Sequence, residues 1–325
     1  MKFGIVGCGM IAAFHVNAIR QIEGAELLGV ADVNIDFANS FAEKHNTRAY
    51  ANYQALLDDP AVDVVCICTP SGFHAENAKM ALKHNKHVVV EKPMALLPED
   101  ADELVELCKS SDRLLTVISQ IRFAPDIQKV KKLIEENAFG KIVQVNLSMM
   151  YCRTPEYYSG SAWKGTWKLD GGEMMNQGIH GIDIMRYLVG SVKKVHGLSK
   201  TLHHNIEAED TAAAVLEFEN GALGTINSTV AAFPGYERRL TICGTLGSVV
   251  IIEDNIEQLN LKDYTYKRDP NGKTKDVSNP SDIDVTGHVI QLTNLINAVN
   301  GTDKLLIDAN ENRETLQLIW GINNR

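Results

Sequence analysis

Two side chains that lie far apart in the sequence belong to the types that move protons in enzymes. Lys92 stands in the short motif Glu91-Lys92-Pro93, and His180 ends the motif Asn176-Gln177-Gly178-Ile179-His180. Burial can lower the pKa of a lysine until it works as an acid or base, and histidine titrates near neutral pH. Taken alone, a lysine in such a turn is explained equally well by a solvated surface charge.

A third motif, Gly7-x-Gly9-x-x-Ala12, follows an apolar run at the start of the chain and precedes a helical pattern. Gly7 permits a tight turn, Gly9 lets the backbone approach a pyrophosphate, and Ala12 lets the helix lie close to the strand. The phosphates would meet the free N–H groups near Met10 and Ile11 at the helix start. Because the motif has a strand before it and a helix after it, it predicts a dinucleotide site.

Asp32 ends the second predicted strand, where a dinucleotide fold places an acidic residue. Its carboxylate would accept hydrogen bonds from a ribose 2′-OH and would repel a 2′-phosphate. Val33 and Asn34 follow, so no arginine stands beside it to accept that phosphate. The sequence therefore favours NAD over NADP as the cofactor.

The elements that must position these residues alternate between strand and helix over residues 1–122. Several of the strands are apolar throughout, as expected for parallel strands that are covered on both faces. This rhythm predicts an α/β fold with a doubly wound parallel sheet of the Rossmann type. The predicted strands cover residues 2–6, 26–31, 48–49, 62–68, 87–90 and 114–119, and the predicted helices cover 11–22, 35–45, 53–57, 75–84 and 98–110.

Ligands of such sheets bind at the carboxyl ends of the strands. Two of the loops with chemically useful side chains come directly after the fourth and fifth predicted strands, at residues 69–76 and 91–93. We therefore expect cofactor contacts from these loops and from the residue after the sixth strand. The predicted cofactor-binding residues are Gly7, Gly9, Met10, Ile11, Asp32, Thr69, Pro70, His74, Glu91, Lys92 and Gln120.

The pattern changes at residue 123, so we expect an NAD-binding domain over 1–122 and a second domain over 123–325. Runs with strand character, separated by short polar turns, predict an α/β domain with an open, largely antiparallel sheet. Residues 263–280 are expected to form a surface loop, and Thr286 to cap a helix over 287–299. The other predicted elements are helices at 125–137, 178–188 and 311–322 and strands at 141–151, 193–202, 210–217, 222–230, 237–243 and 248–253.

The order of the motifs resembles one superfamily of oxidoreductases. G-x-G-x-x-A, T-P-x-x-x-H-A-E, E-K-P and G-G-x-x-x-N-x-G-I-H are similar to motifs of the glucose–fructose oxidoreductase, inositol dehydrogenase and MocA superfamily, and the likeness covers nearly the whole chain. The resemblance implies a Rossmann domain and a second domain whose sheet builds homodimers or homotetramers. It also implies hydride transfer between a nicotinamide and a hydroxyl carbon of a sugar, cyclitol or sugar derivative.

Under this resemblance, Lys92 matches the active-site lysine and His180 matches the catalytic histidine. We expect His180 to be the main acid–base group, with Lys92 assisting it. Asp183 lies on the same face of the predicted helix as His180, and we interpret it as a surface charge rather than as a group that orients His180. The apolar face of that helix is expected to consist of Ile179, Ile182, Met185 and Leu188.

Asn176 departs from the polyol-dehydrogenase form of the motif, in which many members carry aspartate. Members that resemble sugar-nucleotide uronate dehydrogenases also carry asparagine there. The cations Arg122, Arg153, Lys164 and Lys168 would suit a carboxylated or phosphorylated sugar, or they are solvated surface residues. The predicted substrate-binding residues are Lys92, Arg122, Trp163, Trp167, Asn176 and His180, although aromatic residues at this spacing also serve as packing residues.

Composition excludes several other classes of function. A net charge of −9, from 32 basic and 41 acidic side chains, disfavours nucleic acid or an anionic membrane as the main partner. We find no signal peptide and no apolar run near the roughly 20 residues of a membrane helix. Six scattered cysteines are interpreted as buried hydrophobes, which fits a reducing cytoplasm. His203 and His204 would point opposite ways on a strand, so we expect no metal site.

Two alternatives to a dehydrogenase remain open at this point. Some relatives use bound NAD transiently to cleave glycosidic bonds without net redox change. Others are non-catalytic NAD-binding regulators, which have no need of both Lys92 and His180. The sequence does not specify the sugar, the carbon or the direction of the reaction.

Overall fold

The computed structural model describes residues 1–262, 264–268 and 284–324. The chain divides into two compact units, each built from two segments. The first comprises Met1–Gln120 and Val277–Arg313, and the second comprises Ile121–Asp276 and Glu314–Arg325. The division into functional domains after residue 122 stays a prediction. The first compact unit also includes Val277–Arg313, which the sequence pattern placed in the second domain.

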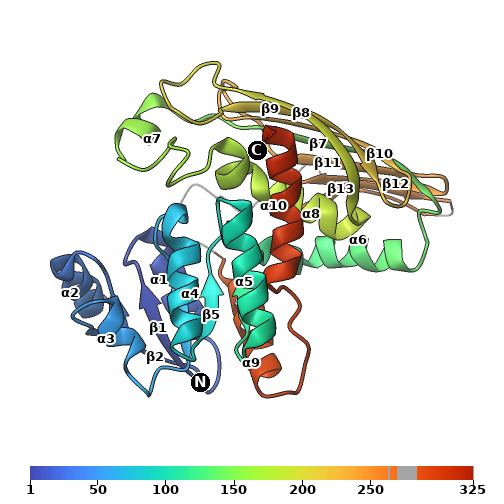
Figure 1. Cartoon of the computed structure of the whole chain (residues 1–325). Helices are drawn as coiled ribbons and strands as arrows, with labels where there is room; N and C mark the ends of the chain where they lie inside the picture. The colour runs from blue at the N-terminus through green and yellow to red at the C-terminus, as the bar shows by residue number, and fades with distance from the viewer. Residues whose placement is uncertain (263, 269–283, 325) are drawn as a thin grey trace. The chain divides into compact units, whose positions relative to one another are not determined.

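The first unit contains a parallel six-stranded sheet with the strand order β3-β2-β1-β4-β5-β6 (Figure 1). This order confirms the predicted doubly wound Rossmann sheet, in which β1 and β4 adjoin where the order reverses. The strands are β1 (Lys2–Val6), β2 (Glu26–Ala31), β3 (Arg48–Ala49), β4 (Val64–Ile67), β5 (His87–Val90) and β6 (Leu115–Val117). The helices are α1 (Met10–Ile19), α2 (Ile35–Lys44), α3 (Tyr53–Leu57), α4 (His74–Lys83), α5 (Pro98–Ser110) and α9 (Thr286–Val299), with a 3-10 turn η1 (Ser71–Phe73).

The central strands of this sheet are buried on both faces. Every residue of β4 and of β5 is buried, as the apolar composition of β4 predicts. Helix α9, which follows the second sheet in the sequence, packs against α1, with Leu292 and Leu295 fully buried in the same core as Phe3. Cys8, Cys66 and Cys68 belong to this core, so their interpretation as buried hydrophobes is confirmed, whereas Cys108, Cys152 and Cys243 are only partly buried.

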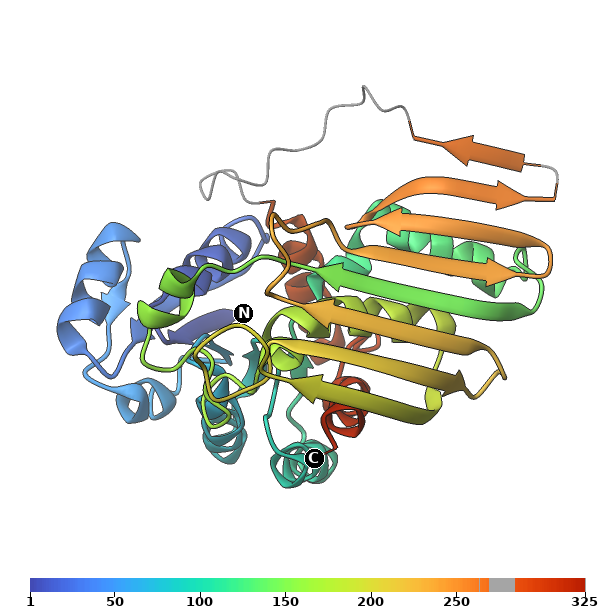
Figure 2. The same ribbon diagram turned by 90° about the horizontal axis from the view of Figure 1, so that it is seen from above.

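The second unit contains an eight-stranded sheet with the order β14-β13-β12-β11-β7-β10-β9-β8, which Figure 2 shows with its strands side by side. Among the described strands of this sheet, only β7 and β10 pair in parallel, so the largely antiparallel sheet is confirmed. The strands are β7 (Ile142–Met150), β8 (Val192–Lys200), β9 (Thr211–Phe218), β10 (Leu223–Thr229), β11 (Arg239–Gly244), β12 (Gly247–Ile252), β13 (Asn255–Leu261) and β14 (Tyr264–Lys267). The other elements are η2 (Gln120–Phe123), α6 (Pro125–Glu135), α7 (Pro155–Ser159), the π-helix η3 (Met174–Gly178), α8 (Ile179–Val189) and α10 (Ala309–Asn323).

Burial in this second sheet alternates along the strands, as in β9, where every second residue is buried. Helices α6 and α8 pack against one face of the sheet, α8 on β7 and α6 on β13. The face that the helices cover supplies the core of this unit.

Two predictions about the later part of the chain are wrong. The predicted loop over 263–280 contains strand β14, whereas its residues 263 and 269–280 lie outside the described part of the chain. Thr286 is the first residue of α9 rather than its cap, and its backbone N–H donates to the side chain of Asp284 at 2.9 Å. Strand β13 and the short helix α7 were not predicted.

Candidate active site

The glycine turn after β1 has the shape that a pyrophosphate needs. Gly7 has φ +89°, and a Cβ there would meet the Cys68 carbonyl at 2.7 Å, so only glycine fits. A Cβ at Gly9 would meet nothing within 4 Å, and α1 begins at the next residue, Met10, with no side-chain cap. Open space therefore lies beside the unsatisfied N–H groups of a helix start, which fits a bound phosphate group.

Asp32 is fixed directly behind this turn. Its Oδ2 accepts a hydrogen bond from the Cys8 backbone N–H at 2.8 Å, and its Oδ1 accepts one from Asn34 N–H at 2.9 Å. The side chain of Val33 is fully exposed. Each carboxylate oxygen retains a lone pair for a further donor, so the residue can accept the hydroxyls of a ribose. Met10 and Ile11 are the first two residues of α1, and Met10 is 77% exposed whereas Ile11 is half-buried.

Thr69 and Pro70, which follow β4, are half-buried, whereas His74 is buried. The two ring nitrogens of His74 contact backbone carbonyls, Nε2 at 2.7 Å from Thr69 O and Nδ1 at 2.7 Å from Pro93 O. The histidine thus connects the loop after β4 to the loop after β5. Gln120, beyond β6, has its backbone carbonyl beside α9.

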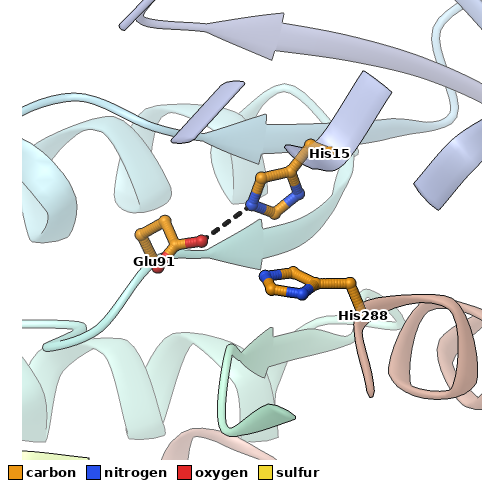
Figure 3. Close-up of side chains that lie close together, drawn as sticks. All are labelled: His15, Glu91 and His288. Carbon is orange, nitrogen blue, oxygen red and sulfur yellow. Dashed lines mark hydrogen bonds and ion pairs between the residues drawn. The ribbon is translucent and has the colours of Figure 1, made fainter. Parts of the chain in front are cut away.

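Glu91 is buried at the end of β5, directly before the half-buried Lys92, and forms a cluster with two histidines (Figure 3). His15 Nε2 on α1 contacts Glu91 Oε1 at 2.8 Å, and His288 on α9 stacks edge-on to His15 with ring centroids 5.6 Å apart. Burial alone would raise the pKa of Glu91, but the hydrogen bond and charge of His15 bring it down to about 2. Burial and the nearby His15 charge lower the pKa of His288 to about 4.

The ligand atoms of these three side chains lie within 4.8 Å of one another, close enough to hold a metal ion. No fourth cysteine, histidine or carboxylate joins the set among the described residues. A zinc ion with three protein ligands needs an open position for water, and all three groups here are buried. The ion pair of His15 with Glu91 accounts for the arrangement, and we assign no metal to it.

His180 lies in the second unit, in the first turn of α8, which continues from the π-helix η3. The predicted apolar face is confirmed, since Ile179, Ile182, Met185 and Leu188 are all buried, whereas His180 is half-buried. Asn176 stands four residues before His180, and its Nδ2 donates to the buried Asp170 carboxylate at 2.5 Å. The Asn176 amide is thereby held in one orientation.

The interpretation of Asp183 as a surface charge is wrong. Asp183 is buried, and its two carboxylate oxygens accept from Arg122 Nε at 2.8 Å and Nη2 at 2.6 Å. Thr315 on α10 also donates to Asp183. Arg122 is 3% exposed, so it is not a solvated surface cation, and its contact with substrate stays a prediction.

A cluster of two cations, one aromatic ring and one amide lies beside Asn176. Arg153 Nη2 donates to the Gln177 side chain at 2.7 Å, and the Arg153 guanidinium lies 5.4 Å from the centre of the Tyr157 ring. Lys164 Nζ lies 3.7 Å from the same ring, and burial lowers its pKa. We call Arg153, Tyr157, Lys164 and Gln177 the cationic cluster.

The other aromatic and charged residues of the loop at 152–172 are less enclosed. Trp163 and Trp167 are half-buried, and Lys168 is exposed. His203 and His204 lie in a loop after β8 rather than on the predicted strand. His204 is buried beside Asp210, with 3.2 Å between Nδ1 and Oδ2.

Two buried carboxyl groups near η3 were missed by sequence reasoning. Glu173 accepts a hydrogen bond from Ser228 Oγ at 2.6 Å, and Glu209 accepts from the Met174 N–H at 3.1 Å. Burial raises the pKa of Glu173 to about 8 and that of Glu209 to about 7. Glutamate side chains are usually exposed to solvent, and no local sequence pattern indicates that these two are buried.

Comparisons with known proteins identify the family. A profile described as the oxidoreductase family with an NAD-binding Rossmann fold matches residues 1–119, and a GFO/IDH/MocA C-terminal domain profile matches residues 127–250. The chain belongs to the Gfo/Idh/MocA oxidoreductase family. The predicted resemblance is therefore confirmed. Within the described residues, no helix has both the length and the apolar character to cross a bilayer.

The chain is similar to relatives with different names. It is 30% identical over 269 residues to myo-inositol 2-dehydrogenase of Thermotoga maritima, covering 79% of this chain and 76% of that one. It is 32% identical over 251 residues to the Bacillus subtilis oxidoreductase YrbE, covering 75% and 72%. The WlbA dehydrogenase of Bordetella pertussis, solved with NADH and UDP-GlcNAcA, is 33% identical with a TM-score of 0.89, covering 99% of this chain and 95% of that one.

Proposed function

We propose that this protein is an NAD-dependent dehydrogenase that oxidises a hydroxyl carbon of a nucleotide-linked sugar acid. The observation that carries the substrate class is the cationic cluster beside Asn176, in which Arg153 and Lys164 both lie over the Tyr157 ring. A sugar acid joined to a nucleotide presents a carboxylate and phosphates, which such cations and an uncharged asparagine accommodate. The likeness to a dehydrogenase solved with UDP-GlcNAcA supports the same class.

The preference for NAD rests on Asp32, whose carboxylate is held by two backbone N–H groups behind the glycine turn. A fixed negative charge there repels a 2′-phosphate and accepts ribose hydroxyls. Gly7, Gly9, Met10 and Ile11 would hold the pyrophosphate. A bound nicotinamide supplies the hydride acceptor for the reaction.

In the proposed reaction, His180 takes up the proton of the substrate hydroxyl as the C–H bond gives up its hydride. Lys92 donates a hydrogen bond to the same oxygen and assists the proton transfer. Asn176 carries no charge and takes up no proton, so it contributes hydrogen bonds to the substrate. Trp163 and Trp167 offer apolar faces to the sugar, in line with the predicted substrate contacts.

A direct test follows NADH absorbance with purified protein, NAD and either a UDP-linked uronic acid or myo-inositol. We expect turnover with the acid, at least about tenfold weaker turnover with myo-inositol, and loss of turnover with bound NAD retained in Lys92→Ala and His180→Asn. Lys164→Met should raise KM for the acid, whereas Lys168→Met, four residues away and exposed, should not. Faster oxidation of myo-inositol would overturn the substrate class. Cofactor that stays bound without net NADH formation would instead indicate redox-neutral chemistry.

A further inference from the structure

His74 joins two loops at the carboxyl ends of neighbouring strands in the first unit. It is 1% exposed at the start of α4, and its ring lies between the carbonyls of Thr69 and Pro93. Thr69 comes two residues after β4, and Pro93 comes directly after Lys92. The ring is thus the bridge between the predicted cofactor loop and the lysine motif.

The chemistry of the two acceptors fixes the protonation of the ring. A carbonyl oxygen only accepts hydrogen bonds, so each ring nitrogen must donate one. A neutral imidazole carries a single N–H. The lone pair of its second nitrogen would then lie 2.7 Å from the lone pairs of the other carbonyl oxygen, which is a repulsive contact. Both contacts are satisfied only by the imidazolium form, whichever way the ring nitrogens are assigned.

The charges around the ring act in both directions. Burial has the largest effect and, with the charge of Lys92, leaves the pKa of His74 below its usual value. The two carbonyl hydrogen bonds and the Glu91 carboxylate act in the opposite direction, and we infer the charged form from the two acceptors at the ring nitrogens rather than from this balance. Glu91 remains ionised because His15 donates to it, so a negative charge is kept near the ring.

We propose that His74 is a permanently protonated clamp that positions Lys92, and that it acts from behind the cofactor loop rather than by touching the cofactor. One cation closes two charge-assisted hydrogen bonds, which are shorter and stronger than neutral ones. The Lys92–Pro93 turn is thereby held at a fixed distance from Thr69. The positioning role rests on the catalytic role proposed for Lys92, whereas the charge of the ring does not.

The charge is measured on the wild-type protein with bound NAD. Protein labelled with 15N in its histidine rings would be studied by long-range 1H–15N correlation spectroscopy from about pH 6 to about pH 8. We expect one buried histidine, missing from the spectrum of His74→Gln, to show two protonated ring nitrogens throughout this range. A signal with one unprotonated nitrogen at neutral pH would overturn the clamp. This arm needs no turnover, so it stands even if the proposed reaction is wrong.

The positioning role is measured with His74→Gln, whose one amide nitrogen can occupy the position of only one of the two ring nitrogens. His84→Gln is the matched control, because His84 lies at the other end of α4 and contacts Met80 O. We expect kcat of His74→Gln to fall about 10- to 100-fold, as displacement of a catalytic group implies. The Kd for NAD should change less than about threefold, and the control should retain its kcat. An unchanged kcat in folded His74→Gln would refute positioning, and so would a loss of NAD binding equal to the loss of kcat.

Discussion

Replacing Glu173 with glutamine should make the stability of this protein less dependent on pH. Glu173 is buried, its Oε1 accepts from Ser228 Oγ, and its Oε2 has no partner among the described residues. Burial and the neighbouring Glu209 carboxyl raise the pKa of Glu173 from 4.5 to about 8. The folded chain therefore holds this proton at pH values where the unfolded chain has already released it.

The sign follows from the number of protons that each state binds. Between pH 4.5 and about 8 the folded state binds one more proton at Glu173, so the free energy of unfolding falls as pH rises. The stabilisation is complete below the unfolded pKa and is lost as pH rises through the folded pKa. One extra proton corresponds to about 1.4 kcal/mol per pH unit. From about pH 5.5 to about pH 7.5, we expect Glu173→Gln to gain roughly 1–3 kcal/mol relative to wild type.

The assay is urea unfolding of wild type and Glu173→Gln at several pH values, with the difference in free energy of unfolding plotted against pH. Glutamine keeps the acceptor for Ser228 and removes only the titration. Glu219→Gln, at an exposed glutamate, serves as the control and should give a flat difference. A difference for Glu173→Gln that does not change with pH would refute the argument that the buried carboxyl is neutral in the folded state.

Three further predictions follow from the geometry. Asp183→Asn should lower the free energy of unfolding by about 3–5 kcal/mol in urea titrations, because it leaves the buried Arg122 guanidinium without its anion. Gly9→Ala should leave the melting temperature unchanged, since a Cβ there meets nothing within 4 Å, yet it should weaken NAD binding at least about tenfold by calorimetry if the pyrophosphate occupies that space. Asp32→Ala should raise the Kd for NAD about tenfold and reduce the preference for NAD over NADP. Competitive titration of the two cofactors measures both effects.

The first sheet was predictable because its signals are local. Strand β4 is apolar at every residue, and the glycine turn, Asp32 and the Glu91-Lys92-Pro93 motif each follow a strand end. The edge of the second sheet was not predictable in this way. Strand β14 is an edge strand in which Tyr264, Thr265 and Tyr266 are exposed, and it lies in a polar segment, so its composition matches a loop.

The burial of charged residues was also not predicted, because their partners are distant in sequence. Arg122 and Asp183 are 61 residues apart, and Glu173 and Ser228 are 55 apart. The helical spacing predicted that Asp183 lies on the same face of α8 as His180. It could not show that Arg122 and α10 cover Asp183 on that face. Sequence periodicity predicts which face a residue occupies, whereas only the tertiary structure shows what packs on that face.

Two sets of buried charged residues lie next to the residues that we propose to transfer protons. Glu91 directly precedes Lys92 and contacts His15, and His74 contacts the carbonyl of Pro93, which directly follows Lys92. Asp183, which pairs with Arg122, lies one turn beyond His180. A buried ion pair is a weak source of net stability, because the desolvation of two charges offsets much of their attraction. It is, however, costly to break, so it holds the attached backbone in one arrangement. The placement of these pairs therefore makes more sense as a means of fixing Lys92 and His180 within their own units than as a means of stabilising the fold.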